Sequence, residues 1–186
     1  MSSKREQLVE TASRLFAEHG FHATGIDTVL AESGIAKKTL YNHFRTKNEL
    51  ILAVLRQHDS AFRNYFMRQV ESLAETPRER LLAIFDVAEN WFSQKNFYGC
   101  LFINAIGEFS DHDSPVREIC REYKKLMRDY IRELAKQAGA GNPADLAEEL
   151  AILLEGAIVT AQVSQNTRAA EIAKRVAETL VNEAID

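Results

Sequence analysis

Polar and basic side chains fill a short stretch around Leu40 whose chemistry suits the surface of DNA. Lysine and asparagine can donate hydrogen bonds to purine edges, and a threonine methyl group can contact thymine. Tyrosine and histidine can hold phosphate oxygens. If the stretch is helical, Leu40 and Phe44 lie four residues apart on one face. The opposite arc then carries Lys37, Lys38, Thr39, Tyr41, Asn42 and His43. This pattern predicts a short helix that reads base edges.

A second short helix is expected just before it, over residues 24–33. Thr24 can cap its first backbone N–H groups, while Asp27 reaches back in a capping box. Gly34 ends it, because glycine tolerates the left-handed geometry of a tight turn, and the next helix begins near Ala36. Its inward residues are Ile26, Val29 and Leu30, with Ile35 at the corner. Two short helices joined by a glycine turn are typical of a helix-turn-helix DNA-binding unit.

Thr46 and Glu49 repeat the capping-box pattern directly after this pair. The free backbone N–H groups of the helix that begins there, together with Lys47, form a seat for a phosphate. The alternative is that all of these polar residues form an ordinary solvated helix face. The turn, the spacing and the second cap together favour DNA binding.

These residues resemble the DNA-binding domain of the tetracycline-repressor (TetR) family of bacterial regulators. The matching pieces are residues 16–21, Thr24, Ala31, residues 33–35, residues 40–44 and residues 47–50. The resemblance implies that Thr24, Tyr41, His43 and Lys47 hold phosphates, and that Lys37, Lys38, Thr39 and Asn42 approach the bases. Lys38 departs from the family, which often has a small residue there. A long cation at this position could read a base or clamp a phosphate.

The composition predicts an all-α chain. Of 186 residues, 46% are hydrophobic and 27% charged, as in ordinary soluble globular proteins. Only 8 Gly and 3 Pro fall among long periodic segments, whereas a β-rich fold needs turn residues more often. The net charge of −4 is uneven, because residues 1–50 carry seven Lys/Arg and six Asp/Glu. This small excess of positive charge favours a specific DNA contact by a dimer over nonspecific coating of DNA.

Capping residues divide the rest of the chain into helices. Ser3 and Glu6 open a first helix that ends near Gly20 and faces inward through Leu8, Ala12, Leu15 and Phe16. Three further starts are marked by proline after a capping residue: Thr76-Pro77, Ser114-Pro115 and Asn142-Pro143. With helices over 46–73, 100–109 and 168–184, about nine are expected. We assign residues 1–46 to a helix-turn-helix DNA-binding domain and residues 47–186 to a ligand-binding and dimerisation domain.

The last two helices are expected to form a homodimer. The helix after Pro143 is apolar on nearly every side, which predicts that it is buried all round. Alanines in the final helix allow a partner helix to approach closely. The predicted interface comprises Leu150, Leu154, Ala157, Ile158, Ala161, Ile172, Val176 and Leu180. The alternative is a core within one chain. We favour a dimeric four-helix bundle, which the resemblance also implies. The two helix-turn-helix units of such a dimer would bind the two halves of an inverted-repeat operator.

The middle of the chain is rich in aromatic residues that could surround a ligand between helices. The pocket is expected to use Phe62, Phe66, Phe85, Trp91, Phe102, Asn104, Tyr123, Met127 and Gln162, with Glu108 as a further polar anchor. Each aromatic residue taken singly is more simply explained as core. The resemblance implies a small apolar or amphipathic effector that releases the operator and a sixth helix that transmits the signal.

Four other functions are compared with a ligand-released repressor by the residues that each would need: an activator, a thiol sensor, an architectural protein and an enzyme. Activation stays an alternative, because the position of the operator decides whether a bound regulator represses or activates transcription. Cys100 could sense oxidants or electrophiles instead of packing as a small apolar residue. An architectural DNA-binding protein would leave the apolar body without a purpose. An enzyme is not expected, since no nucleophile elbow, P-loop, zinc-protease or dinucleotide motif is present.

No cofactor, metal or membrane partner is expected. Cys100 and Cys120 lack the spacing of a metal site or a disulfide framework, which fits a reducing compartment. The chain starts without an apolar leader, and its longest apolar run, residues 150–161, is interrupted by Glu155 and too short to span a bilayer. We therefore expect a cytoplasmic protein.

Overall fold

The computed structural model describes residues 3–185, and within that range it contains helices and no strands. The described helices are α1 (Lys4–His19), α2 (Ile26–Ser33), α3 (Lys37–His43), α4 (Lys47–Leu73), α5 (Pro77–Phe92), α6 (Leu101–Glu108), α7 (Pro115–Gln137), α8 (Pro143–Ser164) and α9 (Arg168–Ile185). The prediction of an all-α chain with about nine helices is confirmed.

Local capping explains where several helices begin. The Ser3 side chain accepts from the Glu6 backbone, and the Glu6 carboxylate accepts from the Ser3 backbone. The same reciprocal box joins Thr76 and Glu79 at the start of α5. The helix starts expected at Pro77, Pro115 and Pro143 are confirmed. Each proline costs little there, because its missing N–H would have no partner in the first turn.

Two expected caps differ in the structure. The N-cap of α2 is Gly25, which has no side-chain cap, so Thr24 and Asp27 do not form the predicted box. At the start of α4 the Glu49 carboxylate accepts from the Arg45 backbone N–H at 2.8 Å instead of reaching Thr46. Thr46 still accepts from the Glu49 N–H at 3.2 Å, so half of that box is present.

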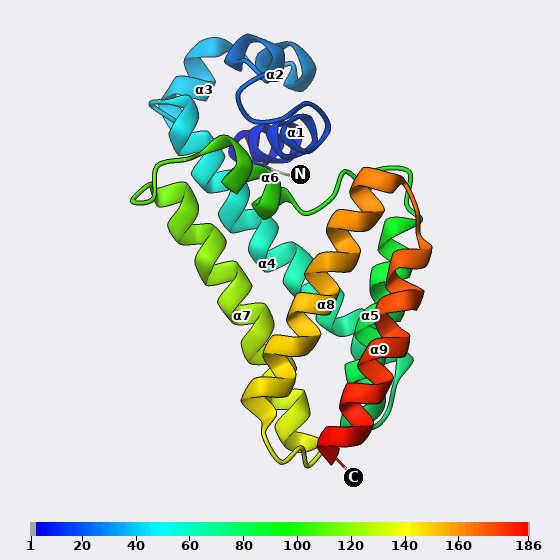
Figure 1. Cartoon of the computed structure of the whole chain (residues 1–186). Coiled ribbons are helices and arrows are strands. Elements are labelled where there is room, and N and C mark those ends of the chain that lie inside the picture. The colour runs from blue at the N-terminus through cyan, green and yellow to red at the C-terminus, as the bar shows by residue number, and fades with distance from the viewer. Residues whose placement is uncertain (1–2, 186) are drawn as a thin grey trace. The chain divides into compact units, whose positions relative to one another are not determined.

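The contacts of the chain divide it into two compact units. The reader unit combines the described residues of Met1–Phe62 with Leu101–Tyr123, and the bundle unit combines Arg63–Cys100 with the described residues of Lys124–Asp186. Helices α4 and α7, labelled in Figure 1, each have residues in both of these units by the ranges given above. The predicted domain boundary after residue 46 stays a prediction.

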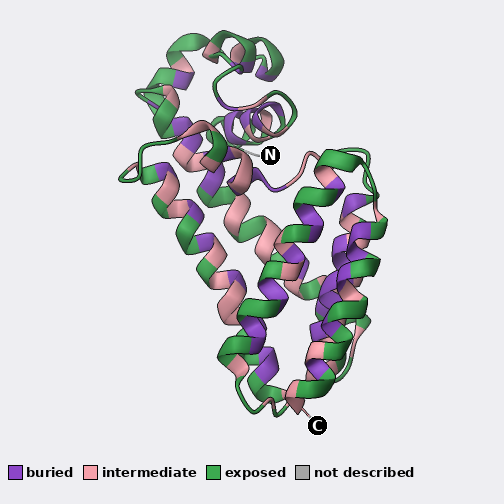
Figure 2. Ribbon diagram, in the orientation of Figure 1, coloured by how far each residue is buried: buried purple, intermediate pink, exposed green. Residues whose placement is uncertain are grey.

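In the reader unit, α1 packs against α2 and α3. Its inward stripe is confirmed, since Leu8, Ala12, Leu15 and Phe16 are at most 2% exposed. Phe16 stacks on Phe21 with ring centroids 5.1 Å apart, which extends this core past the end of the helix. Buried positions follow one side of α1 in Figure 2. The helix therefore acts as the brace on which α2 and α3 rest.

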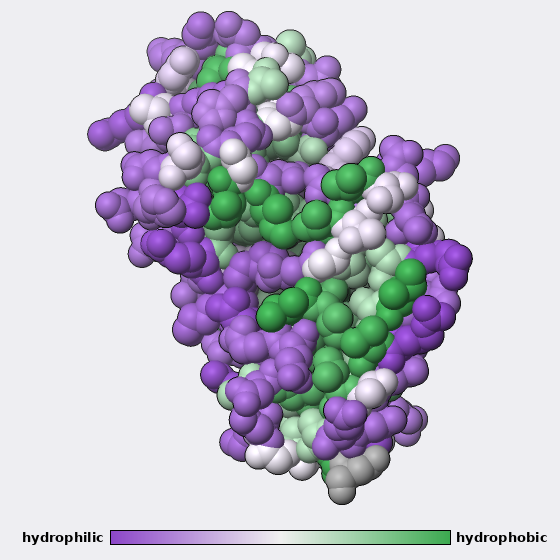
Figure 3. Space-filling model, in the orientation of Figure 1, coloured by the Kyte–Doolittle hydropathy of each residue, from purple (hydrophilic) through white to green (hydrophobic). Residues whose placement is uncertain are grey.

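In the bundle unit, α9 packs against both α5 and α8 (Figure 1). Lys174 of α9 donates to both carboxylate oxygens of Asp86 of α5, at 2.7 and 2.8 Å. The expected burial of α8 on all sides is not reached within one chain, because Ile152 is 69% and Val159 42% exposed, and burial by a second copy stays a prediction. Apolar side chains gather along α8 and α9 on the face shown in Figure 3. An apolar face is therefore left uncovered.

Among the described residues, no helix combines the length and the apolar character needed to cross a membrane.

Candidate functional site

The turn between α2 and α3 has the geometry that a helix-turn-helix requires. Gly34 adopts the left-handed conformation, with φ 66° and ψ 15°, directly after α2 ends. Ala36 is the N-cap of α3, so this helix begins near the residue where it was expected to begin. Leu40 is fully buried and Phe44 is 3% exposed, so both anchor α3 in the reader unit. The remaining side chains of α3 are thereby directed outward.

The polar arc of α3 lies at the surface. The side chains of Lys37, Lys38, Asn42 and His43 are exposed and Thr39 is half-buried. Tyr41 is 45% exposed, although an aromatic ring normally prefers burial. Lys37 lies 3.6 Å from the Asp27 carboxylate, and both groups are exposed, so water screens this pair. The structure thus brings the six predicted α3 residues together on one surface helix, and their DNA contacts stay predictions.

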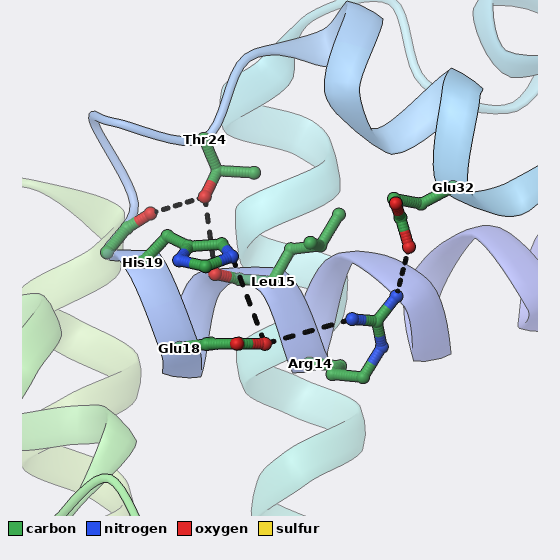
Figure 4. Close-up of polar contacts among 7 residues, drawn as sticks. Arg14, Leu15, Glu18, His19, Thr24 and Glu32 are labelled. Atoms are coloured by element: carbon green, nitrogen blue, oxygen red, sulfur yellow. Dashed lines mark hydrogen bonds and ion pairs between the residues drawn. The ribbon is translucent and has the colours of Figure 1, made fainter.

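Thr24 has a different position from that of the α3 residues. It is 2% exposed, and its hydroxyl donates to the Gly20 carbonyl at 2.7 Å, with the Leu15 carbonyl at 3.3 Å (Figure 4). The hydroxyl therefore closes the segment between α1 and α2. A phosphate contact by Thr24, which stays a prediction, would have to use its main-chain N–H.

Lys47 lies where the predicted phosphate seat begins. Its ammonium group donates to the His22 carbonyl at 3.2 Å, and the residue as a whole is half-buried. Burial lowers the pKa of Lys47, and the negative charge of Glu108 partly offsets this by raising it. Lys47 is therefore held against residues that precede α2.

Glu108, at the end of α6, is bound to that same segment. Its carboxylate accepts from the Phe21 N–H at 2.7 Å and the His22 N–H at 2.6 Å, and it contacts His22 Nδ1 at 2.8 Å. Burial alone would raise the pKa of Glu108, but these hydrogen bonds hold it below its ordinary value. In this structure the Glu108 carboxylate is bound by the residues that follow α1, and its expected role as a pocket anchor stays a prediction.

A polar groove of about 420 Å³ opens beside the end of α3. Its lining includes His43, Glu49 and two arginines, Arg5 and Arg56. The Arg5 guanidinium lies 5.3 Å from the centre of the Phe44 ring, a cation–π contact. Arg5 therefore fastens the beginning of α1 to the end of α3. Sequence reasoning missed this contact, because 39 positions separate the two residues.

Two protein-family models together match most of the chain. Residues 8–54 match the bacterial regulatory proteins of the tetR family, and residues 77–177 match the tetracyclin repressor-like C-terminal domain. The second match alone covers more than half of the chain. The chain belongs to the TetR family. Members of this family are DNA-binding transcriptional regulators, not enzymes, and they form dimers.

Curated relatives of this TetR-family chain carry regulator names. It is 27% identical over 170 residues to the HTH-type transcriptional repressor NemR of Escherichia coli K12, a match that covers 87% of this chain and 85% of NemR. It is 30% identical over 131 residues to the HTH-type transcriptional activator FasR of Mycolicibacterium smegmatis. That match covers 70% of this chain but 48% of FasR, so the chain spans about half of that relative.

Solved structures show the same fold. SCO4454, a TetR-family transcriptional regulator from Streptomyces coelicolor, has a TM-score of 0.90 and 27% identity, and the match covers 98% of this chain and 96% of that one. The reduced form of E. coli NemR has a TM-score of 0.85 at 24% identity, covering 96% and 97%. The TetR fold thus extends over essentially the whole chain.

Four aromatic residues of the TetR-family reader unit form a cluster near α6. Phe102 stacks on Tyr123 at 3.8 Å, and the ring of His58 lies between Phe102 at 5.6 Å and Phe62 at 5.5 Å. Burial lowers the pKa of His58 to about 4, and Asp59 partly opposes this shift. His58 is therefore neutral at physiological pH. Sequence reasoning missed His58, whose position one turn before Phe62 was the available signal. Asn104 is half-buried on α6.

The other expected pocket residues lie in the bundle unit. Phe66, Phe85 and Met127 are at most 8% exposed, which fits core packing. Trp91 meets Phe97 edge to face at 5.0 Å. The Gln162 side chain lies so close to Gly99, whose φ is 81°, that a Cβ there would overlap its amide. A ligand role for these residues stays a prediction.

The predicted dimer residues fall into two groups in this TetR-family chain. Five of them are at most 6% exposed in the single chain and therefore belong to its own core: Leu150, Leu154, Ala157, Ile158 and Ala161. On α9, Ile172 and Val176 are each 45% exposed and Leu180 is half-buried. Val163 of α8 is 79% exposed but was not predicted. The exposed apolar face consists of Ile152, Val159, Val163, Ile172 and Val176.

Both cysteines are buried, Cys100 at 4% and Cys120 at 2% exposure. The Cys120 thiol donates a long hydrogen bond of 3.6 Å to the Phe102 carbonyl. Oxidants react with exposed thiolates, so this burial favours a packing role for both thiols.

Proposed function

We propose that this chain is a ligand-responsive repressor that binds an inverted-repeat operator as a homodimer. A small apolar or amphipathic effector releases it. The observation that carries the proposal is the exposed arc of α3, which combines base-reading and phosphate-binding side chains on a helix anchored by Leu40 and Phe44.

Within this proposal, α3 enters the major groove. Lys37, Lys38, Thr39 and Asn42 approach base edges, because their amines, amide and hydroxyl match the donors and acceptors there. Tyr41, His43 and Lys47 hold phosphates and fix the register of the helix on the duplex. Thr24 contacts a phosphate through its main-chain N–H, because its hydroxyl already donates to the Gly20 carbonyl.

The dimer contact is proposed on the exposed apolar face of α8 and α9. Ile152, Val159 and Val163 recur at intervals of seven and four residues, so they share one side of α8. Water contact with this face is unfavourable, and an identical face on a second copy would cover it. Two readers would then meet the two halves of an inverted repeat.

The effector is proposed to contact the aromatic residues of the body, from residue 47 onward. Neutral His58 between Phe62 and Phe102 favours an uncharged or aromatic group over a cation. Repression is preferred to activation because NemR, which matches over 85% of its length, is named a repressor. FasR is named an activator, so activation is the alternative to repression.

An effector screen tests the proposal. The protein is titrated into a fluorescein-labelled inverted repeat that it has selected from a random pool, and the Kd for this DNA is measured. The titration is then repeated in the presence of small aromatic and amphipathic compounds. We expect some compounds to raise both the Kd for DNA at least tenfold and the thermal midpoint of the free protein, since a ligand acts only through its differential affinity. Compounds that stabilise the protein but never change DNA affinity would contradict ligand-dependent release.

A further inference from the structure

The carboxylate of Glu108 makes several hydrogen bonds to one short segment of the chain. It accepts two consecutive backbone N–H groups, from Phe21 and His22, and contacts the His22 ring. Successive N–H groups that converge on one point form an anion-binding nest. Here the anion is supplied by α6, 86 positions away in the sequence.

The last residue of α6 is an unfavourable place for an acid, because the C-terminal end of a helix carries partial negative charge. The three donors offset this cost. Phe109 adds apolar contact, with its ring 6.0 Å from Phe21 and 4.9 Å from His22. Glu108 and Phe109 together therefore join the end of α6 to Phe21 and His22.

Gly20 makes room for the carboxylate. Its φ of 89° suits glycine, and a Cβ there would lie 2.9 Å from the nearer Glu108 oxygen. The glycine thus allows the turn to adopt its conformation and the carboxylate to approach its N–H groups.

The segment that Glu108 binds also contacts Lys47, which belongs to the predicted phosphate seat at the start of α4. The Lys47 ammonium donates to the His22 carbonyl at 3.2 Å, and the Thr24 hydroxyl donates to the Gly20 carbonyl at 2.7 Å. Residues 20–24, which we call the α1–α2 turn, therefore connect α6, the start of α2 and the start of α4. All of these residues belong to the reader unit.

We infer that Glu108 is a positioning residue that holds the α1–α2 turn in its DNA-binding conformation, and that its release is how α6 lowers DNA affinity. The inference rests on the proposed function, in which α6 responds to an effector. It assigns the signal to the Glu108 carboxylate, which lies at the end of α6 and binds the turn, in addition to any contact of α6 with α4.

The test compares Glu108→Gln with wild type on the labelled duplex that wild type enriches from a random pool. An amide keeps the shape but replaces one acceptor oxygen with a donor group that opposes the turn donors. We expect a loss of DNA affinity of about tenfold, within the range of allosteric coupling. The salt dependence should stay unchanged, because no phosphate contact is removed.

Glu79→Gln is the matched control. Glu79 is also a glutamate whose pKa is lowered by hydrogen bonds, from Thr76, but it caps α5 in the bundle unit. We expect it to leave DNA affinity unchanged. Should Glu108→Gln not fold, His22→Phe removes one donor while keeping a ring beside Phe109, and about a threefold loss is expected.

A spectroscopic readout separates positioning from general destabilisation. In NMR spectra without DNA, the amide protons of Phe21 and His22 should lie downfield in wild type and move upfield in Glu108→Gln, with the thermal midpoint no lower than in Glu79→Gln. The inference is overturned if these protons do not move, if DNA affinity is unchanged or increased, or if affinity falls only in step with stability. A wild-type chain that enriches no duplex would instead contradict the proposed function, and the inference with it.

Discussion

The Thr24 hydroxyl donates to the Gly20 carbonyl across 2.7 Å and so closes the turn that precedes α2. Thr24→Val keeps the shape of the side chain and removes this buried hydrogen bond. We expect a loss of about 1 to 2 kcal/mol in the free energy of unfolding, since the donor and the carbonyl partner are both affected. Chemical denaturation measures it.

Thr24→Ser is the control, because it keeps the hydroxyl. Its stability should lie closer to wild type than that of Thr24→Val. Equal stability of all three proteins would show that this hydrogen bond does not hold the turn.

Acid should destabilise the protein through His58. The folded pKa is lowered from 6.5 to about 4 by burial, so the unfolded chain binds a proton that the folded chain excludes. Stability is therefore fully present above pH 6.5 and falls as the pH is lowered towards 4. The shift corresponds to about 3 kcal/mol across that window.

Thermal unfolding between pH 7 and 4 measures this effect in wild type, His58→Gln and His112→Gln. His112 is exposed and serves as the matched control. His58→Gln should show a shallower loss of stability with acid, whereas His112→Gln should follow wild type. Parallel curves for all three would contradict a buried, neutral His58.

A charge in the exposed apolar face should separate the dimer. Val159 lies between Ile152 and Val163 on α8, and Val159→Glu would force a carboxylate into the proposed contact, where it cannot be hydrated. We expect a monomer by light scattering at concentrations where wild type is dimeric, together with weak binding to an inverted repeat. Leu73→Glu, which changes another exposed apolar residue (53% exposed), should stay dimeric. A dimeric Val159→Glu protein would place the interface elsewhere.

Lys38 should contribute to base selection. Its exposed amine lies on the outer arc of α3, so Lys38→Ala should relax preference at one base position, worth about 1 to 3 kcal/mol of discrimination. Lys47→Ala, at the proposed phosphate seat, should weaken all sequences alike and reduce the salt slope by about one. Selection from randomised duplexes separates the two. Uniform weakening by Lys38→Ala would make Lys38 a phosphate clamp.

Helix starts were predictable because capping is local. Ser3 with Glu6, and Thr76 with Pro77 and Glu79, lie within one turn of each other, and the structure contains these caps. Leu40 and Phe44 were likewise identified as the inner face of α3 from their spacing alone.

Contacts between distant segments were not predictable in the same way. Nothing in the sequence near Glu108 reveals that its partners are Phe21 and His22, because no local pattern links positions 86 or 87 residues apart. The sequence also did not reveal which side of α8 stays exposed. Both faces of that helix are apolar, so composition could not distinguish Leu150 from Ile152, which are 0% and 69% exposed.

The central claim is that α3 of a dimer reads a specific operator, and selection from random duplexes tests it most directly. Purified wild type and Tyr41→Ala are each incubated with the pool at several salt concentrations, and bound duplexes are sequenced. We predict that wild type enriches one inverted repeat and that the variant loses this enrichment while remaining folded. Failure of wild type to enrich any sequence, even at low salt, would contradict the account.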